Sequence, residues 1–162
     1  MANVYAVDYA KRFSTVPAKL TNVATQGGRM RILYDTYTVV AATAQNDVVY
    51  FGRLPPDSKV WEVAIQTSAT LGSSSTIDVG WQAVSATATA ANTDLDGWHD
   101  GISGETSSSF WKVGGASTAS GNKGIAIAPT SIPDEADIVA TLLGADPNAD
   151  VVISLMCHYS ID

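Results

Sequence analysis

Apolar and polar residues alternate along two neighbouring stretches in the middle of the chain, at 61–67 and 76–82. Side chains of a strand point alternately to its two faces, so a period of two predicts strands with one buried face and one solvated face. The two prolines at 55–56 cannot donate to a ladder, and a glycine-serine loop at 72–75 separates the stretches. The residues expected to be buried between two sheets are Trp61, Val63, Ile65, Ile77, Val79, Trp81, Ile153 and Leu155.

Further strand signals recur between turn residues along the rest of the chain. Clusters of β-forming residues predict these strands at 30–44, 48–51, 110–113, 125–127, 137–143 and 150–159. The composition of 85–109, rich in Ala, Thr, Ser, Asp and Gly, predicts a long loop instead. Short strands with regular turn signals and no amphipathic helix predict an all-β fold, an antiparallel double-sheet jelly roll of about eight strands.

The last predicted strand has apolar residues on both of its faces. Such a strand is either central in its sheet or covered on its outer face by a partner. We therefore expect a homo-oligomer, and the residues expected at a subunit contact or second layer are Val152, Met156 and His158.

Charge divides the 162-residue chain, whose formal net charge is −7, into two unequal parts. Residues 1–59 have seven basic and four acidic side chains, and residues 60–162 have two and twelve. The segment 1–31 is expected to be an extended N-terminal arm, and 32–162 the jelly-roll domain. A solvated leader and a basic arm that docks on an acidic partner both fit this charge pattern. The candidate partner-binding residues of the arm are Tyr5, Tyr9, Lys11, Arg12, Phe13, Lys19, Leu20, Arg29 and Arg31.

The composition also bears on the class of partner. The acidic body would repel phosphates, so no nucleic acid is expected as a partner. No apolar run approaches the roughly 18 residues of a membrane span, and the N-terminal residues lack the apolar region of a signal peptide, so no membrane is expected either.

Candidate chemistry is sparse. The tripeptide Trp98-His99-Asp100 lies in an acidic stretch whose spacing fails that of a calcium-binding EF-hand loop, so we expect a solvated acidic loop and no metal. Cys157 falls on an apolar strand face and is expected to be an inert core thiol. Trp98 and Trp111 could stack sugars, although burial at a sheet edge or loop base is favoured. We expect no catalytic residues and no cofactor.

The chain resembles the small jelly-roll capsid decoration (cement) proteins of tailed bacteriophages. The resemblance lies in the leader MANVYAVDYAKRF, the stretch DVVYFGRLP, the pair KVWEVAIQ and SSSTIDVGW, and the closing strand DVVISLMCHYSID. It implies a structural virion protein, without enzymatic activity or cofactor, bound in many copies to the outside of an icosahedral head. It also implies frequent homotrimers and an N-terminal segment that lies on the major capsid protein. The alternatives are a phage tail or head-fibre component, or a sugar-binding adhesion module.

Overall fold

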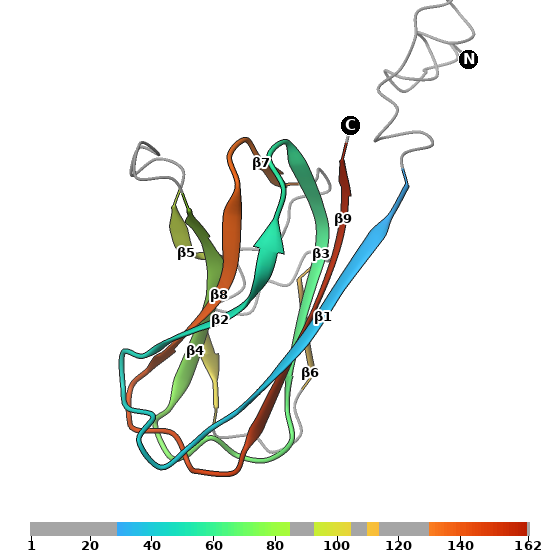
Figure 1. The fold of residues 1–162 in the computed structure, drawn as a ribbon. Helices are drawn as coiled ribbons and strands as arrows, with labels where there is room; N and C mark the ends of the chain where they lie inside the picture. The colour runs from blue at the N-terminus through green and yellow to red at the C-terminus, as the bar shows by residue number, and fades with distance from the viewer. Residues whose placement is uncertain (1–28, 85–92, 105–109, 114–129, 162) are drawn as a thin grey trace, which may run out of the picture.

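The computed structural model describes residues 29–84, 93–104, 110–113 and 130–161. In these residues all regular structure is β-strand (Figure 1). The strands are β1 Arg31–Thr38, β2 Val48–Leu54, β3 Ser58–Thr67, β4 Thr76–Ala83, β5 Asp94–Ser103, β6 Phe110–Val113, β7 Thr130–Ile132, β8 Ala136–Leu143 and β9 Val152–Ile161. None of the described residues forms a helix long and apolar enough to cross a membrane.

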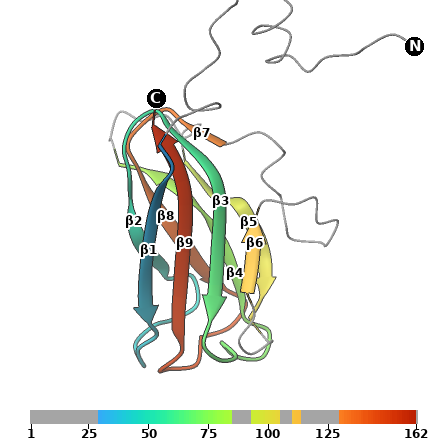
Figure 2. The same cartoon turned by 90° about the vertical axis from the view of Figure 1, so that its right-hand side faces the viewer.

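The strands form two antiparallel sheets that face each other (Figures 1 and 2). Sheet A has the order β1-β9-β3-β6, with the short β7 pairing β3, and sheet B has the order β2-β8-β4-β5. The chain changes sheet at most connections, and the last strand returns to lie between β1 and β3. This order is the double-sheet jelly roll, so the predicted fold is confirmed, with β7 added to its eight strands.

Turn residues border the strands near the predicted positions, although β1 ends at Thr38 and not at 44, and β2 continues to Leu54 and not only to 51. β2 ends at Leu54, before the two prolines, and Ser58 Oγ donates to the Pro55 carbonyl at 2.6 Å as β3 begins. Asp57 has φ 60°, a left-handed conformation that Asp tolerates in turns. Gly144, with φ 82°, opens the turn between β8 and β9.

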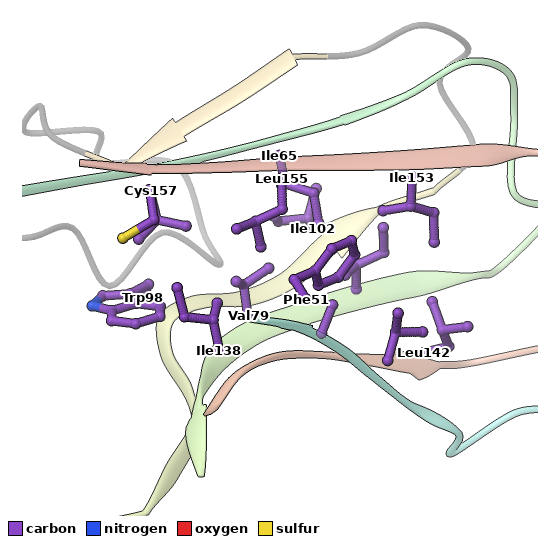
Figure 3. Packing of buried hydrophobic residues seen from close by; sticks show 14 of the residues in the cluster. Phe51, Ile65, Val79, Trp98, Ile102, Ile138, Leu142, Ile153, Leu155 and Cys157 are labelled. Carbon is purple, nitrogen blue, oxygen red and sulfur yellow. The ribbon is translucent and has the colours of Figure 1, made fainter. Parts of the chain in front are cut away.

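The core lies between the inner faces of the two sheets (Figure 3). Phe51, Ile65, Val79, Ile138 and Leu155 point toward one another there, and each is buried. Of the eight residues predicted to be buried, six are fully so: Val63, Ile65, Ile77, Val79, Ile153 and Leu155. Trp81 is only partly buried, although it packs against the core.

The prediction for Trp61 is wrong, because β3 contains a bulge. The β3–β9 register shifts between Val60 and Glu62, which leaves Trp61 as the extra residue of the strand. A bulge shifts the alternation of the strand by one residue. Val60 therefore occupies the core position, fully buried, and Trp61 is half-buried.

The predicted loop at 85–109 is also wrong in its middle part, where β5 pairs with β4. Trp98 and His99 are fully buried in this strand. The predicted strand at 125–127 lies outside the described residues.

Candidate protein-binding surface

The outer face of sheet A is the strongest candidate for a functional surface. On β9, the alternation places Ile153, Leu155 and Cys157 in the core, so Val152 and Met156 point outward. His158 follows on the same outer face. All three outward residues are half-buried within the single chain, because the neighbouring strands β1 and β3 flank them. β9 is therefore a central strand. Of the two explanations for its apolar outer face, a central position and cover by a partner, the first is confirmed.

The edge strand β1 extends this face with two strongly exposed apolar side chains. Ile32 is 66% exposed and pairs with His158, and Tyr34 is 65% exposed and pairs with Met156. Residues directly opposite in an antiparallel pair lie on the same face, so the four side chains form one surface. Ile32 and Tyr34 are not among the residues predicted from the sequence to make a subunit contact. Their two-residue spacing in a strand at the end of a sheet is the signal that indicates them.

The bulge in β3 brings an aromatic ring to the same face. Trp61 Nε1 donates to Oγ of Ser160 at 2.9 Å. Ser160 lies two residues after His158 on β9, so its side chain is on the same outer face, and it is fully buried. Beside it, the Nδ1 of His158 lies 3.2 Å from Oε2 of Glu62. The outer face of sheet A thus combines apolar side chains with one His–Glu pair, the mixture found in protein interfaces.

The outer face of sheet B differs, because polar contacts within the chain already engage its side chains. Arg53 Nε donates to Oδ1 of Asp137 at 2.7 Å, and Glu135 lies 3.8 Å from the same guanidinium. The hydrogen bond with Asp137 raises the pKa of Arg53. Tyr50 OH donates to Oε1 of Gln82 at 2.8 Å. Tyr50 is itself 57% exposed, but the outer face of sheet A has two apolar side chains that are more exposed, Ile32 and Tyr34, next to each other along the strand beside the central β9.

The structure describes two of the nine residues predicted to bind a partner through the arm. Arg29 and Arg31 are exposed, and Arg31 is the first residue of β1, opposite Tyr159 of β9. The remaining seven lie outside the described residues: Tyr5, Tyr9, Lys11, Arg12, Phe13, Lys19 and Leu20.

Two of the candidates for chemistry, Cys157 and Trp98, are buried. Cys157 is a free thiol with no exposed surface, and burial raises its pKa to about 12, which confirms the core position predicted for it. Trp98 packs in the core with its ring centroid 4.9 Å from that of Trp81, so it is not available to stack a sugar. Within the described ranges, no three His, Cys, Asp or Glu residues are grouped so that they could hold a metal ion.

A hollow of about 280 Å³ opens between β1 and β2. Its lining residues are Tyr37, Asp47, Val48, Val49 and Tyr50. The carboxylate of Asp47 accepts a hydrogen bond from the backbone of Ala44 at 2.8 Å and so closes the local turn. The hollow brings together no nucleophile and base.

These observations define a jelly-roll domain with one apolar outer face, and comparisons with known proteins agree on the fold. No protein-family model matches the chain, and no curated protein matches it either. Among solved structures, it is similar to a chain in the capsid of Ralstonia phage GP4, with a TM-score of 0.60 and 19% identity, over 89% of this chain and 92% of that one. It is also similar to a chain in the capsid asymmetric unit of cyanophage Pam1, with a TM-score of 0.52 and 14% identity, over 91% and 96%.

Proposed function

We propose that this protein is a structural component of a phage particle and decorates the outside of the head, where it stabilises the shell of the major capsid protein. The observation that carries the proposal is the match in fold, over nearly the whole of each chain, to chains of two phage capsids. Fold alone does not define a function. The surface of this chain supplies the second argument.

A decoration protein needs surfaces for identical neighbours and for the shell, with weak contacts repeated many times. The outer face of sheet A offers such a surface for a neighbouring copy, and we assign it to a homotrimer. Met156 and Tyr34 are at its centre, with Val152 and His158 beside them. An exposed apolar face of this kind is typical of a surface that is covered in the assembly.

The basic leader supplies the contact with the shell in this proposal. Residues 1–31 contain five of the nine basic side chains of the protein and a single acidic residue, Asp8. Aromatic residues among these charges, such as Tyr5, Tyr9 and Phe13, give the leader apolar surface to bury against a partner. The major capsid protein would present the acidic patch that receives it.

The test begins with particles purified from the phage that encodes the chain. Mass spectrometry should find the protein in many copies per particle, and electron cryomicroscopy should show it outside the shell. Heads that lack the protein should lose integrity at a lower temperature and regain it when purified protein is added. A particle without the protein, or with a few copies at the tail only, would contradict the proposal.

A further inference from the structure

The outer edge of β1 is a second surface, distinct from the outer face of sheet A. Among the strands that the structure describes, β1 ends its sheet, with β9 as its neighbour on one side (Figure 2). It is eight residues long and contains no proline. An edge strand of this length presents a row of backbone N–H and C=O groups to any extended chain, and proteins usually cover or protect such edges.

Backbone hydrogen bonds show which residues of β1 face the free edge. The N–H of Val39 donates to the carbonyl of Val151, and its own carbonyl accepts from Asp150, both at 2.8 Å. Backbone groups alternate between the two sides of an antiparallel strand, so the odd-numbered residues of β1 face β9 and the even-numbered ones face outward. The N–H of Thr36 agrees with this, because it donates to Oδ1 of Asp35 at 2.8 Å.

Two exposed charges restrict which strand can bind at this edge. Arg31 and Asp35 are exposed, lie four residues apart, and therefore share one face of β1. Asp35 alternates toward the core side, opposite Leu155, and an inward-pointing charge on an edge strand discourages random pairing. A strand that brings a cation opposite Asp35 removes this obstacle.

We propose that β1 pairs antiparallel with β1 of a second copy of this chain, about a two-fold axis at Leu33. In this register Arg31 of each copy lies opposite Asp35 of the other, and Ile32 lies opposite Tyr34. The register also matches the backbone, because Ile32 and Tyr34 are even-numbered and form the hydrogen-bonded pairs. Arg31 and Asp35 fall in the non-hydrogen-bonded pairs, where facing side chains are closer.

The pairing satisfies each group that it displaces. The N–H of Thr36 exchanges the carboxylate of Asp35 for the carbonyl of Met30 of the second copy, which releases Asp35 to Arg31 of that copy. Both copies use the same residues, as a two-fold contact requires. This contact uses the edge of sheet A and leaves Val152, Met156 and His158 of its outer face free, so in a decorated head it would join copies of neighbouring trimers. The proposal holds whether or not the protein decorates a capsid.

Cross-linking of the purified full-length protein tests the register. The variant Leu33→Cys is made together with Cys157→Ala, because Leu33 lies opposite Cys157 in the β1–β9 register. Mild oxidation should give disulfide-linked dimers and no larger covalent species. The matched control is Thr36→Cys in the same background, since the two Thr36 residues would lie about 20 Å apart, six strand residues, beyond the reach of a disulfide. Thr36 is more exposed than Leu33, so random collision would favour the control.

Charge exchange tests the partner of Asp35. Arg31→Asp or Asp35→Arg alone should weaken the pairing by about tenfold, because two attractive cross-strand pairs become repulsive. The double variant should restore it, as measured by sedimentation over a range of concentrations. Equal cross-linking of the control, or no effect of the single reversals, would overturn the proposal. The proposal would also be overturned if the dimer were lost only on deletion of residues 1–28, because the leader, and not β1 of the second copy, would then hold the two copies together. These outcomes need no capsid, so they are independent of the proposed function.

Discussion

Burial changes the chemistry of Cys157 more than that of any other titrating residue for which a shift is resolved among the described residues. The thiol lies on the inner face of β9 with no exposed surface, and burial disfavours its charged thiolate, which raises the pKa to about 12. A thiolate is the reactive form of cysteine, so the folded protein should protect this residue from alkylation.

The same shift predicts how stability depends on pH. In the unfolded chain the thiol ionises near pH 9, whereas in the folded protein it keeps its proton to about pH 12. Between these values the unfolded state binds fewer protons, so the free energy of unfolding should fall as pH rises, by at most about 1.4 kcal/mol per pH unit from this group. Urea unfolding at pH 8, 9 and 10 measures the slope, with Cys157→Ala as the control that removes this contribution. An identical slope in the two proteins would contradict the assignment.

Trp61 shows where prediction of single residues from the sequence reaches its limit. Strict alternation predicted that Trp61, Val63 and Ile65 share the core face, and two of these three are in the core. A bulge depends on how β3 pairs with β9, and that pairing is a tertiary property with no signature in the local pattern. The shift matters for function, because it places an aromatic ring on the outer face of sheet A.

At the scale of elements, β4 and β5 depend on close backbone contact. A Cβ added to Gly80 of β4 would lie 1.9 Å from the carbonyl oxygen of Asp94, the first residue of β5. The register of this pair also shifts twice, so β5 lacks the regular alternation that identifies a strand. For this reason the sequence predicted a loop where the structure has a strand.

Gly80→Ala should therefore destabilise the protein through β4 and β5. The added methyl group would meet backbone atoms, which cannot move aside as a flexible side chain can, and overpacking of this kind costs about 1–3 kcal/mol or more. Thr76→Ala, in the same strand, removes atoms instead of adding them and should cost less. Denaturant unfolding of both variants measures the difference. A Gly80→Ala protein as stable as the parent would show that β5 can move away from β4 at little cost.

Strands with regular alternation, by contrast, were predictable as elements. β9 alternates in burial from Val152 to His158, and the prediction that Ile153, Leu155 and Cys157 share the buried face is confirmed. The same pattern predicted that β9 is either central or covered on its outer face by a partner, and the structure shows it to be central. Whether a partner also covers that face depends on a second molecule, and a single sequence does not contain that information.

At the scale of the whole molecule, the chain separates its functions by surface. The outer face of sheet B uses its polar groups internally, as in the contact between Arg53 and Asp137. The outer face of sheet A combines apolar side chains with the His158–Glu62 pair and suits a neighbouring copy, and the outer edge of β1 suits a second one. In the proposed assembly the basic leader would add a third kind of contact, by charge, because its net charge is opposite to that of the body.

Removal of the leader separates folding from binding. Deletion of residues 1–28 should leave a folded jelly roll, because β1 begins at Arg31 and the core formed by the described residues lies beyond the deletion. Circular dichroism and thermal unfolding should be close to those of the intact protein. Binding to undecorated heads, measured by co-sedimentation, should be lost, because burial of a single large apolar side chain is worth about 1.5–3 kcal/mol and the leader has several.

Charge reversal of the leader should weaken the same binding without removing its apolar surface. Exposed ion pairs contribute about 0.2–1 kcal/mol each, so Lys11→Glu, Arg12→Glu and Lys19→Glu together should cost about tenfold in affinity. The loss should be larger at low salt, where exposed charges are less screened, and Lys112→Glu in the body is the matched control. If the truncated protein binds heads as tightly as the intact one, the anchor must be sought on the jelly roll itself, and the outer face of sheet A becomes the first surface to test, because a face assigned to neighbouring copies would then have to contact the shell.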